Sequence, residues 1–294
     1  MAPPPLREAL RVLWYEGYIR VSSRLSDSKT FGLLADGAQK LLGKDGTRAS
    51  QAFYRKNARR VEAVLSWLAD ERSKTLYRSL IAYRCRKNRA DIDPYMQPKS
   101  ASYLDRALIL PGGREVFVDA GAFGGQSSLA FQELCLRAGQ PAPRCVLFEP
   151  EAFNYARLQK NLPLFVKEPI CFPLGLWREA DGRSFTPGAL SSSKIDPSGR
   201  AKIQVDALDA ILQTLPELPP VTYLKIDVEG ADLDVLIGAR KTIEAHRPRI
   251  AVAIYHSDEH MLAIPEYLHA LCPSYQFHVR HYCCLESETV LYCV

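Results

Sequence analysis

The stretch that decides the fold reads Val116-Phe117-Val118-Asp119-Ala120-Gly121-Ala122-Phe123-Gly124-Gly125. Apolar residues lead into a glycine-rich turn, and a segment with helical periodicity follows over residues 127–137. This order predicts a strand, a tight turn and a helix. Such a turn lets a ligand approach the backbone, and the start of the helix points N–H groups at that ligand. The stretch therefore indicates a nucleotide-type ligand bound by an α/β sheet.

Short apolar runs alternate with helical periods along the rest of the chain, which is typical of a parallel sheet with crossover helices. The strands and helices are expected at 116–118, 127–137, 146–148, 153–161, 170–173, 223–226, 231–243, 250–255 and 258–271.

Two β-rich runs, 276–282 and 289–294, end the chain and flank a short polar turn. They predict an antiparallel hairpin. The expected fold is therefore α/β, a Rossmann-like class I methyltransferase sheet that ends in an antiparallel hairpin, whereas nicotinamide-binding folds usually end in parallel strands.

Two carboxylates at predicted strand ends indicate the kind of ligand. Asp119 would repel a pyrophosphate but attract the cationic end of S-adenosylmethionine. Glu149 ends the next strand and can accept hydrogen bonds from ribose hydroxyls. Phe123 stands where the GxGxxG pattern of dinucleotide sites requires glycine. A nicotinamide-dependent oxidoreductase or epimerase is therefore the second hypothesis.

An ordered set of motifs in residues 115–294 resembles the FkbM family of class I S-adenosylmethionine-dependent methyltransferases. The motifs are Asp119-x-Gly121-Ala122-x-x-Gly125-x-x-Ser128, Phe148-Glu149-Pro150, Lys225-Ile226-Asp227-Val228-Glu229-Gly230, Val235-Leu236-x-Gly238-Ala239 and Tyr255-His256. One departure is Asp232, where the family often has Glu. The resemblance implies methyl transfer from S-adenosylmethionine, usually to a hydroxyl of a sugar, polysaccharide or secondary metabolite.

The residues expected to act in such a reaction follow predicted strands. His256 is the candidate base, with Asp227 close to the sulfonium and Glu229 beside it, although Glu229 could equally serve only to interact with the dipole of the next helix. The residues expected to bind the cofactor are Asp119, Gly121, Ala122, Phe123, Gly125, Ser128, Glu149, Leu176 and Asp227.

A divalent metal is an alternative for the same residues. Asp227, Glu229 and His256 could hold Mg²⁺, which prefers oxygen ligands. Because only two carboxylates are visible, Mg²⁺ is disfavoured and no metal is expected.

The 294 residues divide by charge, with 20 Lys and Arg against 10 Asp and Glu in residues 1–100 and 18 against 23 in residues 101–294. We expect a helical N-terminal region over 1–100, with an acceptor-side or oligomerisation role, and the methyltransferase domain over 101–294. A non-catalytic module that binds nucleic acid or an anionic surface is the third hypothesis, but no reading motif accompanies the basic residues and no nucleic acid is expected.

The remaining expectations concern partners and compartment. The partner is a small-molecule or glycan acceptor. An amphipathic stretch over 6–19 would allow peripheral membrane contact, but packing on the domain is favoured. The start of the chain has no signal-peptide pattern and the eight cysteines show no CxxC spacing, which predicts a cytoplasmic protein with free thiols.

Overall fold

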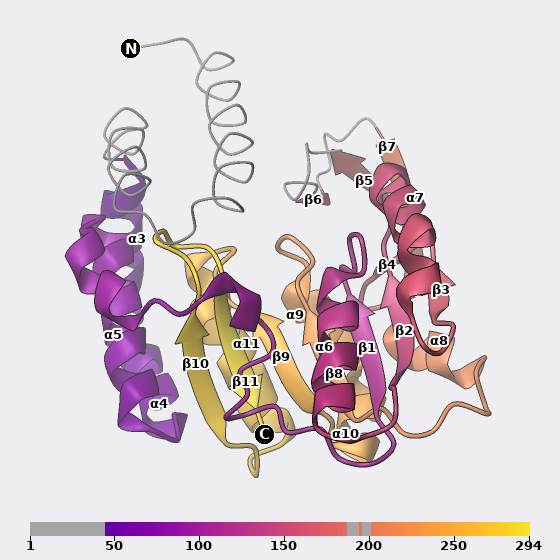
Figure 1. Ribbon diagram of the computed structural model, residues 1–294. Helices are drawn as coiled ribbons and strands as arrows, with labels where there is room; N and C mark the ends of the chain where they lie inside the picture. Colours follow the sequence, from indigo (N-terminus) through magenta and orange to yellow (C-terminus); the bar gives the residue numbers. More distant parts are fainter. Residues whose placement is uncertain (1–44, 187–193, 196–200) are drawn as a thin grey trace.

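A computed structural model describes residues 45–186, 194–195 and 201–294 of the chain. A seven-stranded sheet with helices on both faces forms its centre, and three N-terminal helices lie beside one edge of that sheet (Figure 1). Within the described residues, no helix is both long and apolar enough to cross a membrane. The amphipathic stretch at 6–19 lies outside the described residues.

The large sheet has the strand order β10-β11-β9-β8-β1-β2-β3. Its pairs are parallel except that β11 runs antiparallel to both of its neighbours, β9 and β10. This confirms the predicted α/β sheet with a terminal antiparallel hairpin. The strands are β1 (Val116–Ala120), β2 (Arg144–Phe148), β3 (Ile170–Phe172), β8 (Tyr223–Ile226), β9 (Arg249–Ala253), β10 (Phe277–His281) and β11 (Thr289–Cys293).

Apolar side chains on both faces of these strands explain why helices cover the sheet on two sides. Along β1, Val116 and Val118 belong to one buried cluster and Phe117 to another, as the alternation of a strand requires. The covering helices are α6 (Gln126–Arg137), α7 (Ala152–Asn161), α8 (Leu208–Gln213), α9 (Asp232–Gly238), α10 (Arg240–His246) and α11 (Asp258–Leu271), with a short 3₁₀ turn η4 (Leu162–Leu164).

The prediction of a single helix over 231–243 is wrong, because α9 and α10 are separate helices that meet at Ala239. Gly238 lies against the backbone of Trp177, so closely that a Cβ there would overlap the Trp177 carbonyl oxygen. The break between α9 and α10 therefore lies where the chain that follows strand β4 (Gly175–Leu176) passes next to the helix.

A second, four-stranded sheet of order β4-β7-β5-β6 lies beyond β3 and was not predicted. Its strands are short, and the sequence around β5 and β6 is polar and resembles a loop in composition. From that composition, residues 183–200 are expected to form a mobile cover over the site, but most of them lie outside the described residues. The strands are β4 (Gly175–Leu176), β5 (Asp181–Thr186), β6 (Lys194–Ile195) and β7 (Ala201–Asp206).

The N-terminal helices are α3 (Asp45–Lys56), α4 (Ala58–Trp67) and α5 (Glu71–Arg86); α5 packs against β10, α4 against α11 and α3 against α5. Asp70 joins them to the sheet. Its carboxylate accepts a hydrogen bond from the backbone N–H of Ser73 at 2.6 Å, which caps α5. The same carboxylate bonds His278 at 2.7 Å and the buried Arg280 at 3.1 Å, both on β10.

The segment between α5 and β1 crosses the edge of the sheet in three short 3₁₀ turns, η1 (Arg89–Asp91), η2 (Asp93–Tyr95) and η3 (Lys99–Ala101). The backbone N–H of Gln97 donates to the carbonyl oxygen of His281 at 2.9 Å. This contact places residues 99–104 near the carboxyl end of β1.

The turn after β1 depends on Gly121. This residue has a φ of 81°, and a Cβ at this position would overlap the carbonyl oxygen of Asp227. The close approach brings the loops after β1 and β8 together, which is possible only without a side chain.

Replacing Asp70 by alanine removes both the cap of α5 and one partner of Arg280. We expect the free energy of unfolding to fall by about 2–3 kcal/mol, measured by urea denaturation. Asp70→Asn keeps an acceptor for the cap and should cost about half as much. An unchanged unfolding midpoint for Asp70→Ala would contradict this account of how the helices are attached.

The pH dependence gives a second measurement on the same residue. Although burial acts to raise it, the hydrogen bonds from Ser73, His278 and Arg280 hold the pKa of Asp70 well below its ordinary value. The carboxylate therefore contributes its full stabilisation above about pH 4 and loses it as the pH falls further. We expect the stability difference between wild type and Asp70→Asn to shrink on acidification.

Gly121→Ala should destabilise the protein by about 3 kcal/mol or more, since the methyl group overlaps the backbone of the neighbouring loop. Gly139→Ala is the matched control, because Gly139 has a φ of 71° but no atom within 4 Å of an added Cβ. It carries only the cost of the left-handed backbone, about 1 kcal/mol. Equal melting temperatures for the two variants would show that the close approach at Gly121 is unimportant.

Candidate functional site

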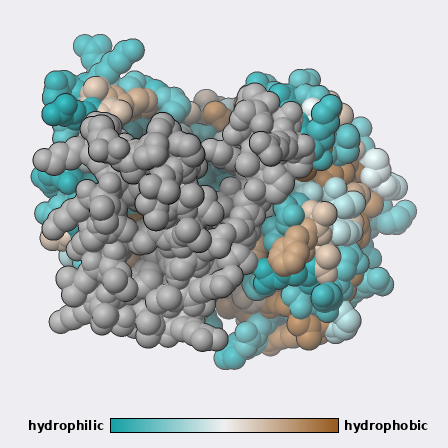
Figure 2. Space-filling view, turned by 90° about the horizontal axis from the view of Figure 1, so that it is seen from above, coloured by the Kyte–Doolittle hydropathy of each residue, from teal (hydrophilic) through white to brown (hydrophobic). Residues whose placement is uncertain are grey.

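A cavity of about 580 Å³ opens at the carboxyl ends of the parallel strands. It lies where ligands bind in open α/β sheets. Figure 2 looks down on this edge, where the described surface is mostly hydrophilic with smaller apolar patches. The cavity is lined by the turn after β1, the ends of β2 and β8, parts of β4 and β7, residues 99–104 and Glu288.

The predicted site residues fall into two groups. Those that line the cavity are Gly121, Ala122, Phe123, Glu149, Leu176, Asp227 and Glu229. The other predicted residues, Asp119, Gly125, Ser128 and His256, lie behind this lining, and the side chains of Asp119 and Ser128 are fully buried. Sequence reasoning therefore found much of the lining but did not separate it from the residues that support it.

Asp119 forms a buried ion pair below the cavity. Its carboxylate lies 2.9 Å from the ammonium of Lys225 and accepts a hydrogen bond from Ser128 at 2.6 Å. Lys225 also donates to the carbonyl oxygen of Gly121 at 2.7 Å. Because its charge is paired with Lys225, Asp119 shapes the turn rather than presenting a free negative charge to the cavity.

Glu149 lies at the end of β2 with both of its carboxylate oxygens fixed. One accepts from the backbone N–H of Phe123 at 2.8 Å and the other from that of Glu151 at 2.9 Å. Burial raises the pKa of Glu149, and these hydrogen bonds and the charge of Lys225 oppose that rise. Each oxygen keeps a lone pair for a ligand, so the carboxylate can accept two further hydrogen bonds.

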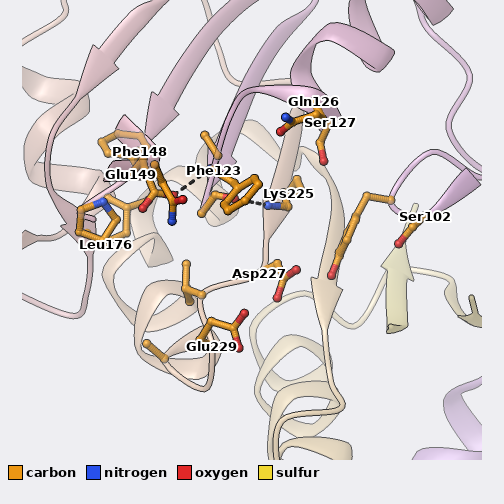
Figure 3. Close-up of a pocket in the computed structure, with 18 of the residues that line it drawn as sticks. Ser102, Phe123, Gln126, Ser127, Phe148, Glu149, Leu176, Lys225, Asp227 and Glu229 are labelled. Atoms are coloured by element: carbon orange, nitrogen blue, oxygen red, sulfur yellow. Dashed lines mark hydrogen bonds between the residues drawn. The ribbon is translucent and has the colours of Figure 1, made fainter. Parts of the chain in front are cut away.

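The cavity has an apolar side and an acidic side (Figure 3). Phe148 and Leu176 lie on the apolar side with Glu149, and the ring of Phe148 stacks on that of Phe172 outside the cavity. Asp227 and Glu229 project from the loop after β8 on the opposite side. A ligand with a flat apolar part and a cationic end would match this arrangement.

His256 lies behind the two carboxylates of the acidic side. Its Nε2 is 3.5 Å from Asp227 Oδ1 and 3.6 Å from Glu229 Oε2, and its side chain is only 9% exposed. Tyr255, the residue before it, donates a hydrogen bond to Asp227 at 3.3 Å. The structure thus brings the three predicted catalytic residues together.

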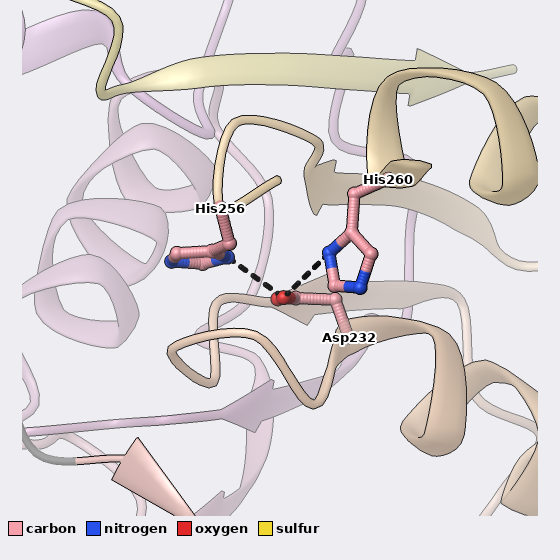
Figure 4. Close-up of side chains that lie close together, drawn as sticks. All are labelled: Asp232, His256 and His260. Atoms are coloured by element: carbon pink, nitrogen blue, oxygen red, sulfur yellow. Dashed lines mark hydrogen bonds and ion pairs between the residues drawn. The ribbon is translucent and has the colours of Figure 1, made fainter. Parts of the chain in front are cut away.

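Asp232 holds this group in place from the start of α9 (Figure 4). Its fully buried carboxylate is 2.7 Å from His256 Nδ1 and 3.6 Å from His260 Nδ1. It also accepts hydrogen bonds from the backbone N–H groups of Val228 and Gly230. The loop that carries Asp227 and Glu229 and the ring of His256 are therefore fixed by one side chain.

The crowding of carboxylates shifts the pKa values of this group. Burial by itself lowers the pKa of His256, but Asp232, Glu229 and Asp227 raise it well above its ordinary value. Burial raises the pKa of Glu229 to about 7, and the charge of Asp227 adds to this shift against the effect of His256. The acidic side of the cavity therefore favours an additional positive charge.

The sequence did not predict the wall of the cavity that faces the acidic side. This wall, called the Lys99 wall below, is formed by Lys99, Ser102, Tyr103 and Glu288. Lys99 and Glu288 form an ion pair at 3.1 Å, and Ser102 donates to Glu288 at 3.4 Å. Tyr103, fully buried, completes this wall beside Asp227. Residues 91–100 have the composition of a linker, so nothing in them pointed to a site. The polar turn of the predicted hairpin was a usable signal, because a turn after a parallel-running strand lies at the carboxyl edge of the sheet.

Comparisons with known proteins agree with the architecture. The chain is similar to a solved structure titled methyltransferase FkbM from Methylobacillus flagellatus, with 23% identity and a TM-score of 0.71. The match covers 83% of this chain and 60% of that one, so this chain spans less than two thirds of its length. A weaker likeness, at 11% identity and a TM-score of 0.42, covers 79% of this chain and 99% of an O-methyltransferase from Bacillus cereus solved with SAH.

A comparison with curated proteins found no match. The sequence profile described as the methyltransferase FkbM domain matches residues 119–278, which is more than half of the chain. The protein therefore belongs to the FkbM methyltransferase family.

Proposed function

We propose that the protein transfers a methyl group from S-adenosylmethionine to a hydroxyl oxygen of a sugar, polysaccharide or secondary metabolite. The proposal rests above all on the position of Glu149 at the end of β2. Two backbone N–H groups hold its carboxylate, and it lies across the cavity from Asp227 and Glu229 (Figure 3). A ribose hydroxyl pair at Glu149 leaves the cationic end of the donor free to reach the acidic side.

The apolar side suits the adenine of this donor. Phe148, Leu176 and Ile203 line it and offer apolar surface to a flat heterocycle. The sulfonium then lies toward Asp227, whose carboxylate attracts it. This orientation leaves the space between Asp227, Glu229 and the Lys99 wall for the acceptor.

The acceptor hydroxyl must lose its proton as its oxygen attacks the methyl carbon in line with the departing sulfur. Asp227 and Glu229 face the cavity and can accept a hydrogen bond from that hydroxyl. His256, the base favoured from the sequence, lies behind them, so its geometry suits positioning the carboxylates better than touching the acceptor.

The opposite wall supports a polar, hydroxyl-rich acceptor. Lys99, Ser102 and Glu288 place a donor, a hydroxyl and an acceptor within a few ångströms of one another. Such alternating groups match the hydroxyls of a sugar or polyol. The ammonium of Lys99 is paired with Glu288, so the wall offers no unpaired cation of its own to a phosphate or carboxylate group.

Isothermal titration with S-adenosylhomocysteine tests the donor site. Glu149→Gln should weaken binding by about 10- to 100-fold, because it removes a buried charged acceptor of hydrogen bonds. Glu133→Gln on the exposed face of α6 is the matched control and should bind as the wild type does. Absence of binding by the wild type, or equal affinity for Glu149→Gln, would refute the proposed donor site.

Mass spectrometry with isotope-labelled donor tests the acceptor class. We expect a gain of one labelled methyl group on a hydroxyl of at least one member of a panel of glycans and polyhydroxylated metabolites. Glu229→Gln should lower kcat on that acceptor by about 10²–10⁴-fold while leaving affinity for S-adenosylhomocysteine within a few fold. Methylation on nitrogen or carbon alone would overturn the assignment to oxygen.

A further inference from the structure

One ring nitrogen at the acidic side of the cavity has no hydrogen-bond partner. His256 Nε2 is buried and makes no hydrogen bond within the described residues; Asp227 and Glu229 lie near it, at ion-pair distance. A buried nitrogen without a partner is costly unless something else satisfies it. Nδ1 lies 2.7 Å from the carboxylate of Asp232, which accepts its proton, so Nε2 is the ring atom that faces Asp227 and Glu229. A metal ion bound to Nε2 would take the place of a proton at that atom.

The distances around this nitrogen fit a shared cation. Nε2 lies 3.5 Å from Asp227 Oδ1 and 3.6 Å from Glu229 Oε2, beyond an ordinary hydrogen bond. Two ligand atoms bound about 2.1 Å from one tetrahedral zinc ion are about 3.4 Å apart. All three ligand atoms lie within 4.8 Å of one another. The group therefore has the spacing of three ligands around one ion.

The hydrogen bond that holds the His256 ring is also typical of a histidine that binds a metal. A histidine that binds a metal usually donates its other N–H to a carboxylate, which fixes the ring. Asp232 does this for His256 and is itself held by the N–H groups of Val228 and Gly230. The cavity opens on the side of Asp227 and Glu229, which leaves a fourth position for a substrate oxygen.

A neighbouring cluster of Asp232, His256 and His260 competes for the same assignment. There the nearest atom of His256 is Nδ1, which Asp232 already binds at 2.7 Å. His260 Nδ1 is 3.6 Å from the same carboxylate and lies on its other side from His256 (Figure 4). An ion in that cluster would have to break the bond that holds His256. The cavity-side cluster requires no such change.

We propose that Asp227, Glu229 and His256 bind one divalent transition-metal ion of the zinc type, with the acceptor hydroxyl as its further ligand. The mixed set of one imidazole and two carboxylates suits such an ion better than Mg²⁺, which prefers oxygen alone. The role given to the ion rests on the proposed function, because it assumes that the acceptor lies on this side of the cavity.

The bound ion would act as a Lewis acid on the acceptor oxygen and lower the pKa of its hydroxyl. The hydroxyl proton passes to the free carboxylate oxygen of Glu229. The oxygen then forms a bond to the methyl carbon as the carbon–sulfur bond breaks. The sulfonium becomes a neutral thioether, so the products are the methyl ether and S-adenosylhomocysteine.

Cobalt titration of the full-length protein, freed of metal by chelation and dialysis, tests this site without the donor or acceptor. We expect one Co²⁺ per chain, with visible absorption bands of low coordination number and no thiolate-to-cobalt charge transfer. Zn²⁺ should displace it, and a large excess of Mg²⁺ should not. No Co²⁺ or Zn²⁺ binding, displacement by Mg²⁺, or a thiolate-to-cobalt band from any of the eight cysteines would overturn the proposal.

Variants locate the ion. Glu229→Gln and His256→Ala should each weaken Zn²⁺ binding by about 100-fold or more, and Asp232→Asn by about 10- to 100-fold. His260→Ala, which removes a ligand of the competing cluster only, should bind as the wild type does. Loss of binding in His260→Ala with retention in Glu229→Gln would place the ion in the other cluster. Melting curves recorded in the presence of a chelator show whether each variant folds. If His256→Ala does not fold, Glu229→Gln still tests the site, because the Glu229 side chain is partly exposed and its replacement should not disturb folding.

The failure of this proposal and that of the proposed function can be told apart. Titration of the metal-free protein with S-adenosylhomocysteine measures the donor site alone. Donor binding without metal binding overturns only the metal site. Metal binding without donor binding leaves the ion in place and removes the proposed methyl-transfer reaction.

Discussion

The buried ion pair between Asp119 and Lys225 is the interaction on which the site depends. The two residues are paired in the parallel register of β1 and β8, so their side chains project from the same face of the sheet and come within 2.9 Å of one another. Asp119 also holds Ser128 at the start of α6, and Lys225 holds the carbonyl of Gly121. One pair thus ties two strands, a turn and a helix together. Removing either member would leave a buried charge without its partner, which costs several kcal/mol.

Much of the fold could be predicted because most strands of the large sheet are short runs of buried apolar residues, which can be recognised in the sequence. The hairpin was visible as two β-rich segments, and its antiparallel strand distinguishes this sheet from nicotinamide-binding ones. The role of Asp119 could not be predicted in the same way. Its charge suggested attraction for a sulfonium, but whether that charge is free depends on Lys225, more than one hundred residues away. Only the register of two strands brings them together.

The site shows the same limit. Asp227, Glu229 and His256 could be found from the sequence because they follow strands, and carboxyl ends of parallel strands meet at one edge. Asp232 looked like a minor departure within a motif, yet it orients His256 and the loop after β8. The wall of Lys99, Tyr103 and Glu288 lies outside the residues that match the family profile.

The charges around the cavity act on the reaction in two opposite ways. In the proposed reaction, the carboxylates of Asp227 and Glu229 would attract the sulfonium of the donor. The proposed divalent ion, bound by the same residues, would repel the sulfonium, which loses its charge as the methyl group leaves. That repulsion is greatest in the bound ground state and declines toward the transition state, so it favours transfer. Without the ion, the carboxylates would stabilise the charged donor more than the transition state, in which that charge is being lost; the proposed ion would offset this effect.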